Sequence, residues 1–178
     1  MKTITNNLIN PMEIAIKEAK KAYLLNEVPV GAVITDKDGN VIAKAFNLVE
    51  KNQDPTAHAE MLVIKEVTLK IKNKYLKDYN LYVTLEPCTM CASAIQNSRI
   101  KRLYFGCNDE KSGAVNSGAK IFNQKNCNHK PEIYDGIRAS ECSLLIKNFF
   151  NEVRKKICLL YTSPSPRDRT RSRMPSSA

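Results

Sequence analysis

The segment Leu81–Cys91, LYVTLEPCTMC, joins a strand pattern to the start of a helix. Its first five residues are largely apolar and predict a strand, and Pro87 is typical of the first turn of a helix. Cys88 and Cys91 are three residues apart at that helix start, so both thiols face one side. The positive end of a helix also stabilises thiolates. This segment therefore predicts two sulfur ligands at a strand-to-helix junction.

A second junction of the same kind carries a histidine and an acid. The segment Asp54–Glu60 reads DPTAHAE, and Thr56 is predicted to cap the helix that follows it. His58 adds an imidazole to the two thiolates, and this set of donors suits zinc. Because three protein ligands leave a coordination position for water, the sequence predicts a catalytic rather than a structural metal.

Glu60 is the predicted proton carrier of this centre. It lies two residues from His58 and is able to take a proton from a water at the metal without being a ligand itself. Residues two apart on an ideal helix point about 200° apart. We therefore expect His58 to lie in an irregular first turn.

The rest of the chain alternates helical and strand patterns, which predicts an α/β/α sandwich. Asn10 and Pro11, with Glu13 able to bond back to the cap, predict the start of a first helix. Residues 28–35 and 41–46 are predicted as an antiparallel pair, because residues 36–40 have hairpin-turn chemistry. The other predicted elements are strands at 103–106 and 132–134, a loop with one short helix over 108–130, and a helix from Glu141 onward.

Length and composition indicate one globular domain. The chain has 178 residues, of which 43% are hydrophobic and 26% charged. We find no apolar run long enough for a signal peptide or a membrane span, so we expect a cytoplasmic protein without a membrane partner, with its six cysteines reduced. The net charge of +10 favours RNA or DNA as a partner.

Residues 161–178, YTSPSPRDRTRSRMPSSA, differ sharply in composition from the rest of the chain. We predict that this tail is disordered and interpret it as non-native sequence, the alternative being an arginine-rich RNA-binding arm. Its four arginines against one aspartate give it +3, so residues 1–160 retain +7 of the +10. The folded domain is accordingly assigned to residues 1–160.

The two junctions together resemble the signature of the zinc deaminases, His-Ala-Glu with Pro-Cys-Thr-Met-Cys. The resemblance extends from about Pro11 to about Lys156 and is specific to the bacterial tRNA-specific adenosine deaminases. The segments that carry it are Glu27–Ala32, Asp54–Glu60, Leu81–Cys88 and Ser98–Ile100. It implies a cytidine deaminase-like fold with a mixed five-stranded sheet, and a homodimer.

The same resemblance implies the reaction and the site residues. The reaction is the hydrolytic deamination of adenosine to inosine at the wobble position of a tRNA anticodon, with one zinc ion per subunit and no other cofactor. His58, Cys88 and Cys91 would hold the metal, and Glu60 would be catalytic. Asn47 would hydrogen-bond the flipped nucleotide and Ala57 would offer a backbone contact to the base. The residues at the family's remaining substrate contacts are Asp109, Lys111, Phe149 and Phe150.

Two other functions stay open at this point. One is a deaminase of a free base or nucleoside, of the guanine or cytosine type. The other is a nucleic-acid-binding module with a structural zinc, in which a fourth ligand comes from Cys107, Cys127, Cys142 or Cys158. These four cysteines are more simply buried thiols, and His129 is more simply a surface or loop residue.

A run of lysines and tyrosines after the first junction has two interpretations. The lysines, residues 65, 70, 72, 74 and 77, could follow RNA phosphates, and Tyr75, Tyr79 and Tyr82 could stack on bases. The plainer interpretation is a solvated helix face for the lysines, and core packing for Tyr82.

Overall fold

Five strands form one mixed sheet in the computed structural model, which describes residues 10–161 and the side chains of residues 10–157. The strands are β1 (Gly31–Thr35), β2 (Val41–Phe46), β3 (Asn80–Leu85), β4 (Arg102–Cys107) and β5 (Glu132–Tyr134). They lie in the order β2-β1-β3-β4-β5. β1 is antiparallel to both neighbours, whereas β3, β4 and β5 are parallel. The predicted mixed five-stranded sheet is confirmed.

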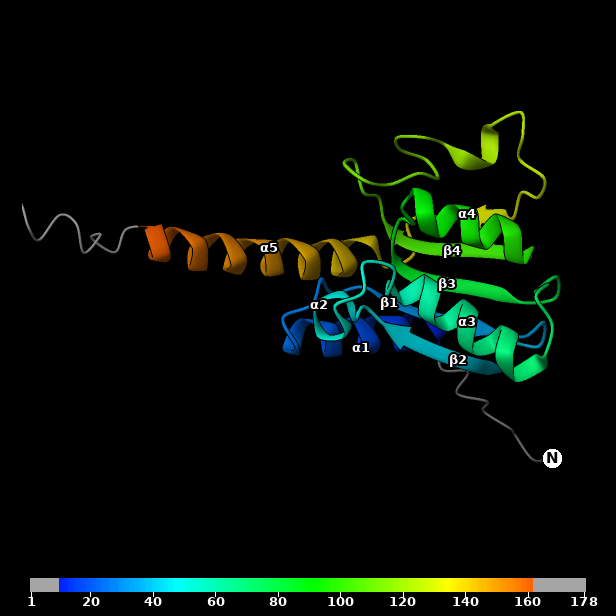
Figure 1. Cartoon of the computed structure of the whole chain (residues 1–178), viewed down its shortest axis with the longest axis horizontal. Coiled ribbons are helices and arrows are strands. Elements are labelled where there is room, and N and C mark those ends of the chain that lie inside the picture. Colours follow the sequence, from blue (N-terminus) through cyan, green and yellow to red (C-terminus); the bar gives the residue numbers. More distant parts are fainter. Residues whose placement is uncertain (1–9, 162–178) are drawn as a thin grey trace, which may run out of the picture.

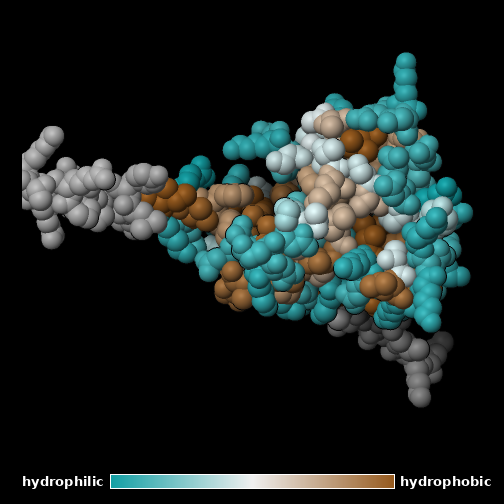
Figure 2. All heavy atoms as spheres, viewed as in Figure 1, coloured by the Kyte–Doolittle hydropathy of each residue, from teal (hydrophilic) through white to brown (hydrophobic). Residues whose placement is uncertain are grey.

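Helices cover both faces of this sheet (Figure 1). They are α1 (Pro11–Leu24), the short α2 (Val49–Asn52), α3 (Ala59–Ile71), α4 (Thr89–Ser98) and α5 (Ala139–Tyr161), with a 3₁₀ turn η1 (Ile121–Asn123). α3 and α4 lie side by side on one face, and α1 with the start of α5 lies on the other. α5 then extends away from the sheet, and Figure 2 shows hydrophobic residues along it. The predicted three-layer α/β/α sandwich is confirmed.

All five residues of the interior strand β1 are buried, and because side chains alternate across a strand, both of its faces are covered. Ala32 and Ile34 belong to the core cluster on the α3 and α4 side, with Val63 of α3. Val33 belongs to the cluster on the α1 side, with Met12. This two-sided burial explains why β1 is a continuous apolar run rather than an alternating pattern.

Several predicted element ends are shifted in the structure. The first helix begins at Pro11 as predicted, with the Asn10 side chain accepting the Met12 N–H, but Glu13 pairs with Lys17 at 3.0 Å. Thr56 is not a helix cap, because its N–H and hydroxyl both bond to Asp54 Oδ1. The helix begins at Ala59 instead. Other elements are shifted as well: the starts are Gly31 for β1, Asn80 for β3, Thr89 for α4, Arg102 for β4 and Ala139 for α5, and β4 ends at Cys107.

Part of the predicted tail lies outside the described residues. Of residues 161–178, only Tyr161 is described, as the last residue of α5. The side chain of Cys158 is likewise outside the described part of the chain. Among the helices that the structure describes, none combines the length and the apolar character that a membrane crossing requires.

Gly31 provides a test of the close approach between α1 and β1. A Cβ at this position would collide with the carbonyl oxygen of Ala15 and lie 2.6 Å from the nitrogen of Ala19, both backbone atoms. We expect Gly31→Ala to lower the free energy of unfolding by about 1–3 kcal/mol or more, because α1 must move away from β1 to make room for the methyl group. Urea denaturation at a fixed zinc concentration measures this loss.

Gly39→Asn is the matched control for this substitution. Gly39 has φ +87° and no atoms within 4 Å of the added Cβ, and asparagine tolerates positive φ. Because only the backbone conformation at residue 39 is affected, its variant should lose at most about 1 kcal/mol and less than Gly31→Ala. Equal stability of Gly31→Ala and the wild type would show that α1 is not held against β1 as described.

Candidate metal centre

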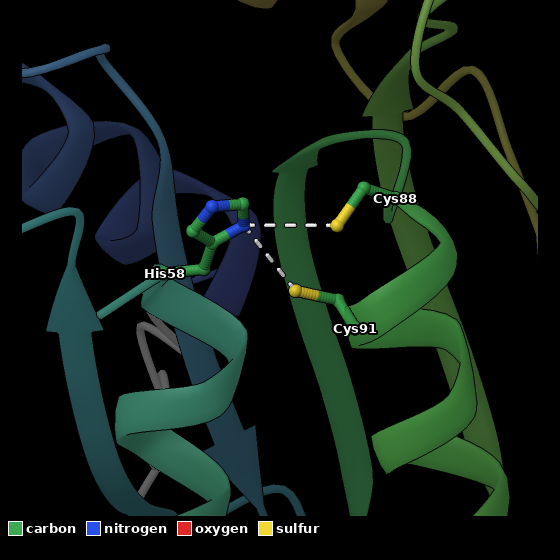
Figure 3. A group of neighbouring side chains, drawn as sticks. All are labelled: His58, Cys88 and Cys91. Carbon is green, nitrogen blue, oxygen red and sulfur yellow. Dashed lines mark hydrogen bonds between the residues drawn. The ribbon is translucent and has the colours of Figure 1, made fainter. Parts of the chain in front are cut away.

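Two helix starts meet at one end of the sheet and bring His58, Cys88 and Cys91 together (Figure 3). His58 is the N-cap of α3 and Cys88 is the N-cap of α4, and both have extended backbone. Cys91 lies in the first turn of α4. Figure 3 shows the three side chains pointing toward one another across the space between the two helices. The sequence analysis predicted this cluster, and the structure confirms that its members meet.

The distances within the cluster fit zinc. His58 Nδ1 lies 3.7 Å from Cys88 Sγ and 3.5 Å from Cys91 Sγ, and all three donor atoms lie within 4.8 Å of one another. Zn–S bonds of about 2.3 Å and a Zn–N bond of about 2.0 Å, at a tetrahedral angle, separate sulfur from nitrogen by roughly 3.5 Å. The side chains would therefore need little movement to hold the ion.

The two thiols differ in acidity. A hydrogen bond from Cys91 lowers the pKa of the Cys88 thiol to about 4, with a further contribution from His58. The same bond, together with burial, raises the pKa of Cys91. One thiolate is thus present without a metal, and the second proton would leave on binding, because zinc is held by thiolates.

Among the side chains that the structure describes, the cluster contains His58, Cys88 and Cys91 and no fourth candidate ligand. Cys107 and Cys142 are buried on the α1 side of the sheet. The thiol of Cys127 donates to the carbonyl oxygen of His129 at 3.2 Å. None of these three supplies a fourth ligand, which argues against a closed structural zinc site.

Glu60 lies in the first turn of α3 and is 4% exposed. Burial raises the pKa of its carboxyl to about 7, so the group is able both to accept and to release a proton near neutrality. The expected irregularity at His58 has a simple form, because His58 precedes the helix as its cap. The 200° separation of an ideal helix does not apply to a residue outside it.

Asn47 and Ala57 lie on the segments that lead into the centre. Asn47 follows β2 and is buried, and its side-chain amide donates to Glu27 Oε2 at 3.5 Å. Ala57 is buried directly before His58, and its carbonyl oxygen accepts the Leu48 N–H at 3.0 Å. This hydrogen bond ties the end of β2 to the start of α3.

Glu27 is a positioning residue that the sequence analysis missed. Its side chain is 1% exposed and accepts backbone N–H groups from Glu50 at 3.2 Å and Lys51 at 2.8 Å, besides the amide of Asn47. A carboxylate at the start of α2 also suits the positive end of that helix. Its place before the apolar run Val28–Pro29–Val30 is the signal that could have shown it to be buried.

Glu86 is a second buried acid that the sequence analysis missed, and it organises the loop after β4. It is 2% exposed. The N–H groups that bond to its carboxylate are those of Asp109, Val115, Asn116 and Ser117, at 2.8–3.0 Å. Burial alone would raise the pKa of Glu86, but these donors outweigh it and the pKa is lowered. The loop is thereby anchored two residues from Cys88.

The four remaining predicted substrate contacts are divided between this loop and α5. Asp109 Oδ1 accepts the N–H groups of Lys111 and Ser112, and Lys111 is exposed. Phe149 is buried with its ring edge-on to Tyr23 of α1 at 5.8 Å, whereas Phe150 is 43% exposed. Of the two phenylalanines, Phe150 is thus the one with a free surface.

Comparisons with known proteins agree with this geometry. The profile of the family described as "Cytidine and deoxycytidylate deaminase zinc-binding region" matches residues 5–107. A tRNA-specific adenosine deaminase of Rickettsia bellii is 49% identical over 144 residues, which cover 80% of this chain and 99% of that protein.

Two solved structures show how far the likeness extends. One is from work on A-to-I editing by tRNA:A34 deaminases at the wobble position of transfer RNA. It has a TM-score of 0.74 and 47% identity, over 76% of this chain and 97% of that one. A guanine deaminase of Bacillus subtilis has a TM-score of 0.54 and 26% identity, over 79% of this chain and 92% of that one. The fold is shared with both, but the sequence is much nearer the first.

The geometry of the cluster predicts that the protein binds zinc and that replacing a ligand thiol removes the ion. The wild-type protein should bind about one zinc ion per chain, and Cys88→Ser should lose most of it, because a hydroxyl is a poor substitute for a thiolate ligand. Metal analysis after dialysis against a weak chelator measures the ratio. Cys127→Ser is the control and should keep the zinc of the wild type. Full zinc content in Cys88→Ser would remove this residue from the ligand set.

Proposed function

Because the chain belongs to the tRNA-specific adenosine deaminase family, we propose that it converts adenosine to inosine by hydrolysis at the wobble position of a tRNA anticodon. The observation that carries this proposal is the His58, Cys88 and Cys91 cluster with the buried Glu60 beside it. Three zinc ligands and a non-ligand carboxyl are what a hydrolytic deaminase requires.

In this mechanism the chain supplies the ligands and moves the protons. Zinc, when held by His58, Cys88 and Cys91, would supply an acidified water as the nucleophile for C6 of adenine. Glu60 would take one proton of that water and pass it to the adjacent ring nitrogen, and would then move the proton of the oxygen added at C6 to the amino group, which leaves as ammonia. A carboxyl with a pKa of about 7 is suited to both directions of transfer.

The proposed substrate contacts follow from the same family membership. Asn47 would hydrogen-bond the flipped nucleotide with its side-chain oxygen, since its amide nitrogen is held by Glu27. Ala57 would contact the base through its backbone, directly before His58. The residues proposed to contact the anticodon loop are Asp109 and Lys111 on the loop anchored by Glu86, and Phe149 and Phe150 on α5.

Two observations favour tRNA over a free base. Residues 1–160 carry +7, which suits a polyanionic substrate. The guanine deaminase is only 26% identical to this chain, against 49% for a tRNA-specific relative. A single-stranded loop is also where extruding the target base costs least.

We further propose that the enzyme is a cytoplasmic homodimer, as the family resemblance implies, with the deaminase domain in residues 1–160. The five cysteines in the described side chains are free thiols, which agrees with a reducing compartment.

Glu60→Gln tests the proton-transfer step. Glutamine fills the same volume but carries no ionisable proton, so we expect inosine formation in unmodified tRNA to fall by roughly 10²–10⁴-fold with zinc content unchanged. Mass spectrometry of the digested tRNA measures the product. Glu66→Gln, an exposed position on the same helix, is the control and should keep wild-type turnover. Full turnover by Glu60→Gln would exclude Glu60 as the proton carrier.

Dimerisation is tested by the mass of the protein in solution. We expect light scattering after size exclusion to give twice the chain mass of 20.1 kDa at micromolar concentration. A concentration-independent mass of one chain would contradict the homodimer and leave the deaminase assignment untouched, because all three ligands come from one chain.

A further inference from the structure

A basic pocket lies at the opposite end of α4 from the metal centre. The pocket has a volume of about 420 Å³, and its cations are Lys77, Arg99, Lys101 and Lys130. Cys88 is the N-cap of α4 and Arg99 is its C-cap. At 1.5 Å per residue the two sites are therefore about 16 Å apart along the helix.

The positive charge of this pocket is not neutralised. None of its four cations forms a salt bridge within the described side chains. Glu132, the one acid of the lining, is held at 2.8 Å by Arg102, which is not a lining residue. The carbonyl end of α4 contributes only about half a negative charge. The pocket is thus strongly positive and open to an anion.

The backbone fixes the segments that carry these cations. The N–H of Leu76 bonds to the carbonyl oxygen of Ser98 at 2.6 Å, and the N–H of Lys101 to that of Tyr79 at 3.0 Å. Glu132 N–H in turn bonds to the Lys101 carbonyl oxygen at 2.9 Å. The His129 ring is fixed by a 2.7 Å contact to the carbonyl oxygen of Ile100. The pocket is therefore preformed.

An aromatic ring extends the basic surface beyond the pocket. The Arg99 guanidinium lies 4.5 Å from the centroid of Tyr75, and the ammonium groups of Lys74 and Lys77 lie at 5.0 and 5.9 Å. Tyr75 and Lys77 also line a second hollow, of about 380 Å³. Cations interleaved with an aromatic ring are typical of surfaces that bind nucleic acid.

We propose that this basic pocket binds backbone phosphates of the RNA substrate outside the anticodon loop. The inference rests on the proposed function, which places the target base at the metal centre. A separation of about 16 Å corresponds to roughly six base pairs of an A-form RNA duplex, so a stem next to the loop is long enough to reach the pocket. Phosphate contacts of this kind add affinity and fix orientation without reading sequence.

The test removes two of the four cations, in Lys77→Gln/Lys101→Gln, and measures tRNA binding at several salt concentrations. We expect the Kd to rise roughly tenfold at about 0.1 M salt. The slope of log Kd against log salt should fall by roughly 1 for each lost contact. The kcat at saturating tRNA and the zinc content should not change. A loop oligonucleotide without a stem should bind the variant and the wild type equally.

Two variants serve as controls. Lys20→Gln/Lys37→Gln removes the same charge from exposed positions on α1 and on the β1–β2 turn, and should bind tRNA like the wild type. Lys77→Arg/Lys101→Arg keeps the charge and should restore binding.

Three outcomes would overturn the inference. The first is an unchanged Kd and salt slope in Lys77→Gln/Lys101→Gln, and the second is an equal loss of tRNA binding in the control Lys20→Gln/Lys37→Gln. The third is that Lys77→Gln/Lys101→Gln loses affinity for AMP while its tRNA binding is unaltered, because this result would indicate a pocket for a free nucleotide instead. Binding and inosine formation are measured separately. A wild type that binds tRNA through the pocket but forms no inosine would therefore contradict the proposed function alone.

Discussion

The convergence of the α3 and α4 starts is the constraint on which the site depends. β1 is antiparallel to β3, and its apolar side chains hold α3 against the sheet next to α4. Extended backbone at His58 and Cys88 then turns two ligands into the space between the helices, where Cys91 joins them. A small rotation of either helix would separate His58 Nδ1 from the sulfurs. The packing of the whole sandwich therefore sets the distances between the ligand atoms to within a few tenths of an ångström.

Much of the fold and the centre could be predicted because strong local signals coincide. Asn10 with Pro11 defined the first helix, and β2 and β5 had the predicted bounds. The prediction that Thr56 caps a helix was wrong. A threonine two residues after Asp54 suits an Asx turn as well as a helix cap, and only the packing of α3 decides which of the two forms. Glu27 and Glu86 were missed for a related reason. Their donors lie 20 to 31 residues away in sequence and become visible only once the chain has folded.

These two buried acids serve a common purpose on either side of the centre. Glu27 gathers the segment after β2, and Glu86 gathers the loop after β4. Each replaces the hydration of an ionised carboxylate with several backbone N–H donors, which is how a buried charge is tolerated. The segments on either side of the centre are therefore each anchored by a single buried side chain.

α4 is a rigid rod with a zinc ligand at its first end and an arginine at its last. An α-helix cannot stretch appreciably without breaking its hydrogen bonds, so the separation between its ends is constant. With the metal centre at one end and phosphate binding at the other, α4 would fix the distance between the reactive base and the bound phosphate. An RNA would be accepted when its reactive base and its backbone are the right distance apart, and this discrimination by length would require no contact with any other base.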